Sequence, residues 1–212
     1  MIYINENNKN EMITMEEAEA ILKMAKRLYP GPLSGVELDW DESFALLRQP
    51  NGERYVLIPD TDDEYFNQEE FDRISTNILE HVNKTYGYNF ANNTKTKCLH
   101  AICHEIGHAI DFYQQEFRGN YYYEDSVQEE YNDFYDSTSA YHRAVEDLND
   151  YLAQEEFEID EDVVKEMRAE IDEIESELDY EYRMITSEAA ADKFSAYFMT
   201  THLRYLKFMF ED

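Results

Sequence analysis

The sequence predicts an α+β fold, with a small twisted sheet near the N-terminus and a mostly α-helical C-terminal half. Runs with strand character are confined to residues 36–58, whereas apolar residues elsewhere recur at the three- and four-residue spacing of a helix face. Hydrophobic residues make up 43% of the chain, with 12 Phe and 18 Tyr, which is enough for a folded core. For 212 residues we expect a single domain over 1–212, with residues 114–183 as an acidic helical insertion.

The first predicted helix begins at Thr14. Thr14 and Glu17 have the spacing of a capping box, in which each side chain bonds the backbone N–H of the other residue. The segment Pro30-Gly31-Pro32 ends the helix, since proline cannot continue it. The expected buried face consists of Ala18, Ile21, Leu22, Ala25 and Leu28.

Three short strands are predicted next, at residues 36–40, 43–47 and 55–58. Asn51-Gly52 lies between the last two and is typical of a hairpin turn. A helix is then predicted over 69–86, and Gly87 ends it. Its expected apolar side consists of Ile74, Ile78, Leu79 and Val82.

The most informative motif is His104-Glu105-Ile106-Gly107-His108, which has the form HExxH. Apolar residues from Leu99 to Tyr113 recur at helical spacing, so the motif lies on a predicted helix. Residues four apart share a helix face, and two imidazoles so placed can bind one zinc ion at about 2.0–2.1 Å. Glu105 would then act as the general base for a zinc-bound water. Alternatively, both histidines are ordinary polar residues on a solvated helix.

A second motif, Glu188-x-x-x-Asp192, follows Thr186 and Ser187, either of which can cap a helix. Glu188 can complete a His, His, Glu metal site and leave the fourth position to water. Asp192, one turn later, can accept the remote N–H of a ligating imidazole and fix its tautomer. Gly107, in the helix interior, would suit the close approach of another backbone or of a substrate, and the alanines at 189–191 would allow two helices to pack closely. The alternative is an ordinary acidic helix start.

Together, HExxH and the later ExxxD resemble the gluzincin class of zinc metallopeptidases. Residues 188–196 are similar to two groups, the ImmA/IrrE-type peptidases and the catalytic domains of the lethal factor and Pro-Pro endopeptidase type. Residues 104–111 are closer to the second group. The resemblance implies a zincin-like fold and a zinc-dependent endopeptidase of the cytoplasm, acting on a protein or peptide such as a repressor. An origin on a phage or mobile element would be consistent with the first group.

The resemblance also implies a tyrosine shortly before the glutamate ligand that stabilises the oxyanion. Tyr182 and Tyr180 precede Glu188 by six and eight residues, on either side of the spacing in that group, and Tyr182 is the candidate. By the same analogy, the strand at 55–58 is expected to form the sheet edge to which an extended substrate adds.

Charge is concentrated in the second half of the chain. Residues 111–183 contain 25 acidic and 5 basic side chains, which accounts for −20 of the net charge of −30. Two helices are predicted here, over 127–152 and over 163–182 with Asp160 as cap, so that they form a helical hairpin. The hairpin could serve as a lid, a docking surface or structural support. The apolar face of the second helix consists of Val164, Met167, Ile171, Ile174 and Leu178.

This charge disfavours nucleic-acid binding, because phosphates demand the opposite sign. It leaves open an alternative function, in which an acidic, DNA-mimicking or inhibitory protein binds a basic partner and the zinc is structural or vestigial. A combination, with the hairpin recruiting a basic substrate, is also open.

No apolar run is long enough to span a membrane. Residues 1–9 lack the features of a secretory signal. The two cysteines, Cys98 and Cys103, are not expected to pair, which suits a reducing cytoplasm. The oligomeric state is not indicated.

Overall fold

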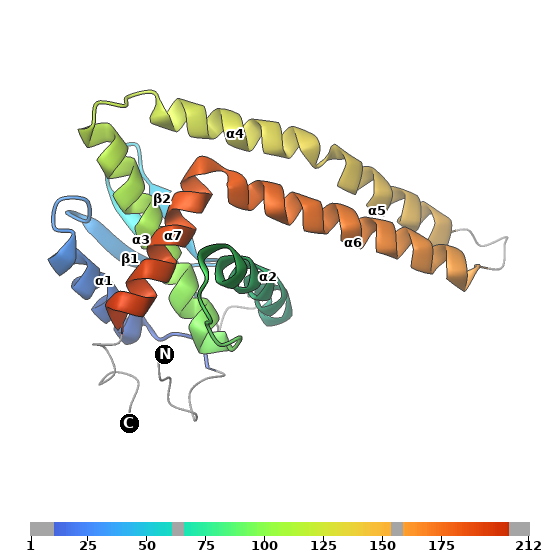
Figure 1. Ribbon diagram of the computed structural model, residues 1–212, viewed down its shortest axis with the longest axis horizontal. Coiled ribbons are helices and arrows are strands. Elements are labelled where there is room, and N and C mark those ends of the chain that lie inside the picture. Colours follow the sequence, from blue (N-terminus) through green and yellow to red (C-terminus); the bar gives the residue numbers. More distant parts are fainter. Residues whose placement is uncertain (1–10, 61–65, 154–158, 204–212) are drawn as a thin grey trace. The chain divides into compact units, whose positions relative to one another are not determined.

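The computed structural model describes residues 11–60, 66–153 and 159–203. In these parts the protein is α+β, with a three-stranded mixed sheet and seven α-helices (Figure 1). The chain forms two compact units, Met1–Tyr123 with Ala189–Asp212, and Glu124–Glu188. The second unit begins later and ends later than the insertion expected at 114–183.

Helix α1 (Met15–Leu28) opens the first unit. The predicted capping box is confirmed, since the Glu17 N–H donates to Thr14 Oγ1 at 3.2 Å and the Thr14 N–H donates to Glu17 Oε2 at 2.8 Å. Four of the five predicted face residues are buried. The prediction for Leu28 was wrong: its side chain is 45% exposed, because it occupies the last position of the helix.

The sheet consists of β1 (Val36–Asp41), β2 (Ala45–Arg48) and β3 (Arg54–Pro59), in the order β1-β3-β2. The predicted hairpin is confirmed, since β2 and β3 pair antiparallel across a turn in which Gly52 has a φ of 88°. On its other side β3 pairs parallel with β1.

The prediction that residues 55–58 form the edge of the sheet was therefore wrong, because β3 is the central strand and β1 and β2 are the edges. The physical reason is visible in Val56, Leu57 and Ile58, which are all buried. A strand covered on both faces is continuously apolar instead of alternating.

The first unit also contains helices α2 (Gln68–Tyr86) and α3 (Thr94–Phe117) and most of α7 (Thr186–Thr201), whose first three residues belong to the second unit. Helix α2 ends at Gly87, as predicted, in the left-handed conformation that glycine adopts without strain. On its predicted apolar side Leu79 and Val82 are buried, whereas Ile74 is exposed, contrary to expectation. Helix α3 is the most buried helix of the first unit, and the core forms around Leu99, Ile102, Cys103, Ile106 and Ile110.

The second unit consists of α4 (Tyr123–Ser137), α5 (Ser139–Leu152) and α6 (Glu161–Met184), and α5 packs along α6 (Figure 1). The single helix predicted over 127–152 is in fact two, separated at Thr138. The hydroxyls of Ser137 and Thr138 donate to the carbonyls of Phe134 and Tyr135, and such bonds compete with helix continuation. The predicted cap is confirmed, because Asp160 Oδ1 accepts from the Asp162 N–H. The predicted apolar face of α6 is half-buried, and neither α5 nor α6 contains a buried residue.

None of the described helices is both long and apolar enough to cross a membrane. Both cysteines are buried and free, as expected. The expectation about a secretory signal concerns residues that lie outside the described ones.

Candidate metal centre

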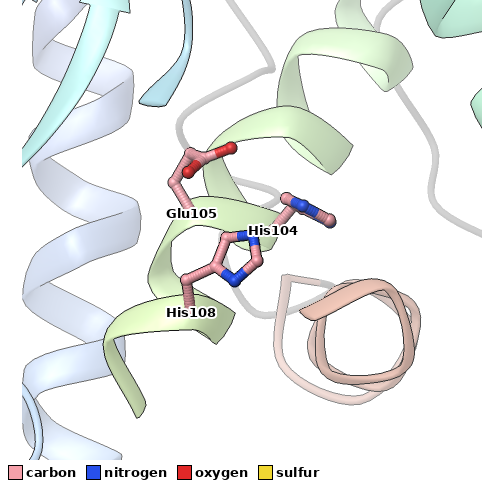
Figure 2. A group of neighbouring side chains, drawn as sticks. All are labelled: His104, Glu105 and His108. Carbon is pink, nitrogen blue, oxygen red and sulfur yellow. The ribbon is translucent and has the colours of Figure 1, made fainter. Parts of the chain in front are cut away.

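Helix α3 places His104, Glu105 and His108 together (Figure 2). Asn93 caps the helix by accepting from the Thr96 N–H at 3.0 Å, so the motif lies in its interior, where the geometry is regular. One potential ligand atom from each of the three side chains lies within 4.8 Å of the others. The two imidazole centroids are 4.6 Å apart with their planes nearly perpendicular. Such a group can hold one metal ion.

The two imidazoles are buried, with 7% of His104 and 8% of His108 exposed, and Glu105 is half-buried. The interpretation of these histidines as polar residues on a solvated helix is therefore wrong. Imidazole nitrogens with a carboxylate suit zinc and related transition metals, whereas calcium and magnesium prefer oxygen alone. The donors of this cluster therefore suit zinc or a related transition metal.

Asp192 on α7 is fully buried, and its Oδ1 accepts a hydrogen bond from Nδ1 of His104 at 2.8 Å. With its proton on Nδ1, the His104 ring carries its lone pair on Nε2, which is the form that ligates a metal. Nε2 of His100, one turn earlier on α3, lies 3.8 Å from the same carboxylate oxygen. Asp192 is thus placed to fix the tautomer and orientation of His104.

Gly107 is required by the contact between α3 and α7. A Cβ atom at this position would lie 2.9 Å from Cα and 3.1 Å from the carbonyl oxygen of Ala191, and 3.2 Å from the Phe194 ring. Real Cβ atoms essentially never approach backbone so closely. Of the two close neighbours expected at this glycine, another backbone or a substrate, the structure has the backbone of α7.

Glu188 belongs to the second compact unit and lies on the first turn of α7, with only 3% of its surface exposed. Within this unit, Tyr131 Oη donates to Glu188 Oε1 at 2.5 Å. Arg183 Nη1 lies 3.4 Å from Oε2. The carboxylate is therefore held by side chains of α4 and α6.

Tyr182, the candidate for oxyanion stabilisation, lies in the same cluster. Its ring packs at 6.1 Å from Tyr131 and at 5.3 Å from Phe134, and its hydroxyl is hydrogen-bonded to Glu188. Burial, followed by the charge of Glu188, raises the pKa of both Tyr131 and Tyr182 above the ordinary value, so both hydroxyls remain protonated donors at neutral pH. Tyr180, the other tyrosine considered, is exposed.

The first turn of α7 is capped from another helix. Thr186 or Ser187 was expected to cap it, but Thr186 is the first helical residue, and both its N–H and its hydroxyl donate to Glu130 of α4, at 2.6 and 2.9 Å. Glu130 and Tyr131 were not identified from the sequence, because they are remote from Glu188 along the chain. The one local signal, the amphipathic pattern of α4, indicates a packed face without indicating its partner.

Cys103 precedes His104 but does not qualify as a ligand. Burial raises the pKa of its thiol and raises the pKa of Cys98 to about 12. Among the described residues, neither cysteine belongs to the group of side chains whose ligand atoms lie close enough together to hold a metal ion. Comparisons of the chain with protein-family models, with curated proteins and with solved structures find no match.

Proposed function

We propose that the protein is a zinc-dependent metalloendopeptidase of zincin-like fold that hydrolyses peptide bonds of a cytoplasmic protein. The observation that carries the proposal is the buried His104–His108 pair with Glu105 within 4.8 Å. It is supported by the carboxylate of Asp192 behind His104, an arrangement common at metal-ligating histidines. Two unpaired cysteines support a reducing compartment, hence the cytoplasm.

The ion would be held by His104, His108 and Glu188. Glu188 precedes Asp192 by four residues on the continuous helix α7, so the two carboxylates share a helix face. Three protein ligands leave a position for water, as in catalytic zinc sites. The chemistry that zinc supplies when bound is polarisation of the scissile carbonyl and a lowered pKa of water.

Glu105 is the proposed general base. Its half-buried carboxylate is accessible to an incoming peptide, and it would take a proton from the attacking water and return it to the leaving amine. Asp192 would hold the His104 ring during this transfer. For Tyr182, the hydrogen bond to Glu188 supports a role in holding that carboxylate in place of the oxyanion role first considered.

An extended substrate would add to β2, in place of the central strand first expected. β2 is an edge of the sheet and packs against α3. Arg48 at its end lies 5.2 Å from the ring centroid of Phe112, one helical turn after His108. A peptide paired with β2 through main-chain hydrogen bonds would therefore run beside the proposed catalytic residues.

The alternative is an acidic interaction protein that binds a basic partner, on a scaffold whose zinc is structural or vestigial. The observation that favours it is α6, a long acidic helix with no buried residue. Binding through such a surface would weaken steeply with salt and would not depend on Glu105. Peptide hydrolysis would depend on Glu105 at any salt concentration.

The test is Glu105→Gln, with Glu116→Gln as matched control, because Glu116 is exposed on the same helix. We expect both variants to retain stoichiometric zinc, measured by elemental analysis. New protein termini in a host proteome, detected by mass spectrometry, should appear with the wild type and Glu116→Gln and be absent with Glu105→Gln. Cleavage by Glu105→Gln at the wild-type rate, or a wild type without bound transition metal, would refute the proposal.

A further inference from the structure

Helix α4 of the acidic unit contacts the first turn of α7 at three consecutive residues. Glu130 accepts both hydrogen bonds of Thr186, Tyr131 Oη lies 3.3 Å from Ser187 Oγ, and the same hydroxyl donates to Glu188 at 2.5 Å. These contacts join residues 56 and 57 positions apart in sequence. The segment that carries Glu188 is therefore fixed by α4.

We infer that Tyr131 is a positioning residue for the third zinc ligand, holding the Glu188 carboxylate so that it can complete the metal site. The inference rests on the proposed zinc site. It goes beyond it by giving the acidic helical unit a defined part in metal binding.

The strength of the contact supports this role. Hydrogen bonds to an ionised carboxylate are roughly twice as strong as neutral ones, and Tyr131 Oη donates such a bond to Glu188 Oε1. Because Glu188 is almost completely buried, water cannot replace a lost donor at little cost. Arg183, at 3.4 Å, is the weaker contact. Removal of the Tyr131 hydroxyl should therefore leave the carboxylate less firmly oriented, held by its contacts with Arg183 and Tyr182.

The packing around Tyr131 explains why the hydroxyl is well placed. Its ring lies against Tyr182, which in turn packs edge-on against Phe134, so three aromatic rings from α4 and α6 support one another. Arg183 lies over the Tyr182 ring at 4.9 Å. The cluster restricts the Tyr131 side chain, and a fixed donor loses little entropy when it orients a ligand.

The hairpin could serve as a lid, a docking surface or structural support. The contacts of Tyr131 with Glu188 favour structural support for the part of the hairpin that contacts α7. Of the three proposed metal ligands, only Glu188 would be affected by loss of the α4 contacts. A protein lacking the Tyr131 hydroxyl should then bind zinc through two good ligands and a poorly held third.

The experiment measures the affinity of the full-length protein for Zn²⁺ by competition with a chromophoric chelator. Tyr131→Phe keeps the ring and removes one oxygen. Tyr135→Phe is the matched control, because Tyr135 lies one turn later on α4 and is 61% exposed. We expect about 10- to 100-fold weaker zinc binding for Tyr131→Phe, and wild-type affinity for Tyr135→Phe.

A double-mutant cycle with Glu188→Gln distinguishes positioning from general support. If Tyr131 acts through Glu188, then Tyr131→Phe should weaken zinc binding no further in the Glu188→Gln background. The absorption spectrum of the Co²⁺-substituted protein provides a second readout, which should change for Tyr131→Phe and stay unchanged for Tyr135→Phe. Because this spectrum arises only from bound cobalt, it reports the site even in a variant of lower stability.

Equal zinc affinity and cobalt spectra for wild type and Tyr131→Phe would overturn the inference and leave the proposed function intact. An additive loss of affinity in the double variant would also overturn it, because it would show an effect independent of Glu188. Absence of zinc binding by the wild type would overturn the proposed function together with the inference.

Discussion

The two compact units differ in how much of each helix they bury. In the first unit, α3 holds Leu99, Ile102 and Ile106 with no exposed surface, between the sheet and further helices. In the second unit, α5 and α6 contain no buried residue, although α6 is as long as α3. A pair of helices covers only one stripe of each partner, so every residue of that stripe stays partly open to water.

This difference shows that a long, regular helix need not be a stable one. Most helical stability in proteins comes from packing of an apolar face, and the packed face of α6 is only half-buried. The second unit should therefore open locally more readily than the first. Within the described residues of this unit, Val127 and Ile185 are buried, and the rings of Tyr131, Phe134 and Tyr182 pack against one another.

The largest expected contrast comes from one substitution made in both units. Leu99→Ala in α3 should lower the free energy of unfolding by about 3–5 kcal/mol, because the cavity forms in a closed core. Leu178→Ala in α6 should cost roughly 1 kcal/mol, because water already reaches the half-buried site. Urea unfolding followed by circular dichroism measures both. Equal losses would contradict the proposed difference between the units.

A second pair of variants tests charge burial. Lys95 is buried in the first unit, and its Nζ donates to Glu17 Oε2 at 2.7 Å. Glu17→Gln leaves this ammonium without its counter-charge and should cost about 3 kcal/mol. Glu177→Gln, on the exposed face of α6, should change stability by less than about 0.5 kcal/mol. Urea unfolding followed by circular dichroism, which reports the helices of both units, measures both variants.

The smallest expected effect concerns the helix crossing at Gly107. Alanine favours a helix by about 1 kcal/mol over glycine, yet Gly107→Ala should lower stability by about 1–2 kcal/mol, because overpacking against α7 outweighs this gain. The reverse exchange in the second unit is Ala169→Gly, on an exposed part of α6. It should lower the free energy of unfolding only by the difference in helix propensity between alanine and glycine. Thermal denaturation compares the two. Stabilisation by Gly107→Ala would show that the crossing tolerates a Cβ.

Local features of the sequence were sufficient to predict most helices and strands of the fold. The Thr14–Glu17 box, the hairpin turn at Gly52 and the Asp160 cap depend on neighbours within a few residues, and each is confirmed. Strand order depends on pairing between distant segments, so the central position of β3 was missed, although its continuous apolar run indicated it. The interruption at Thr138 was missed because hydroxyl groups compete with the backbone only in particular rotamers.

The residues of the candidate site also fall into those that the sequence could predict and those that it could not. His104, Glu105 and His108 lie within one helical turn, so their convergence on α3 follows from helix geometry alone. Tyr131 and Glu130 contact the first turn of α7 through tertiary packing, and nothing in the composition separates Tyr131 from the other 17 tyrosines. Spacing along the chain identified Tyr182 near Glu188 but did not indicate what its hydroxyl contacts.

The two thiols of α3 can report how often the core around that helix opens. Cys98 and Cys103 are inaccessible and protonated in the folded protein, so an alkylating reagent can modify them only while the surrounding core is open. The rate at which they are alkylated in the native protein therefore measures the frequency of local opening around α3, the helix that carries His104 and His108.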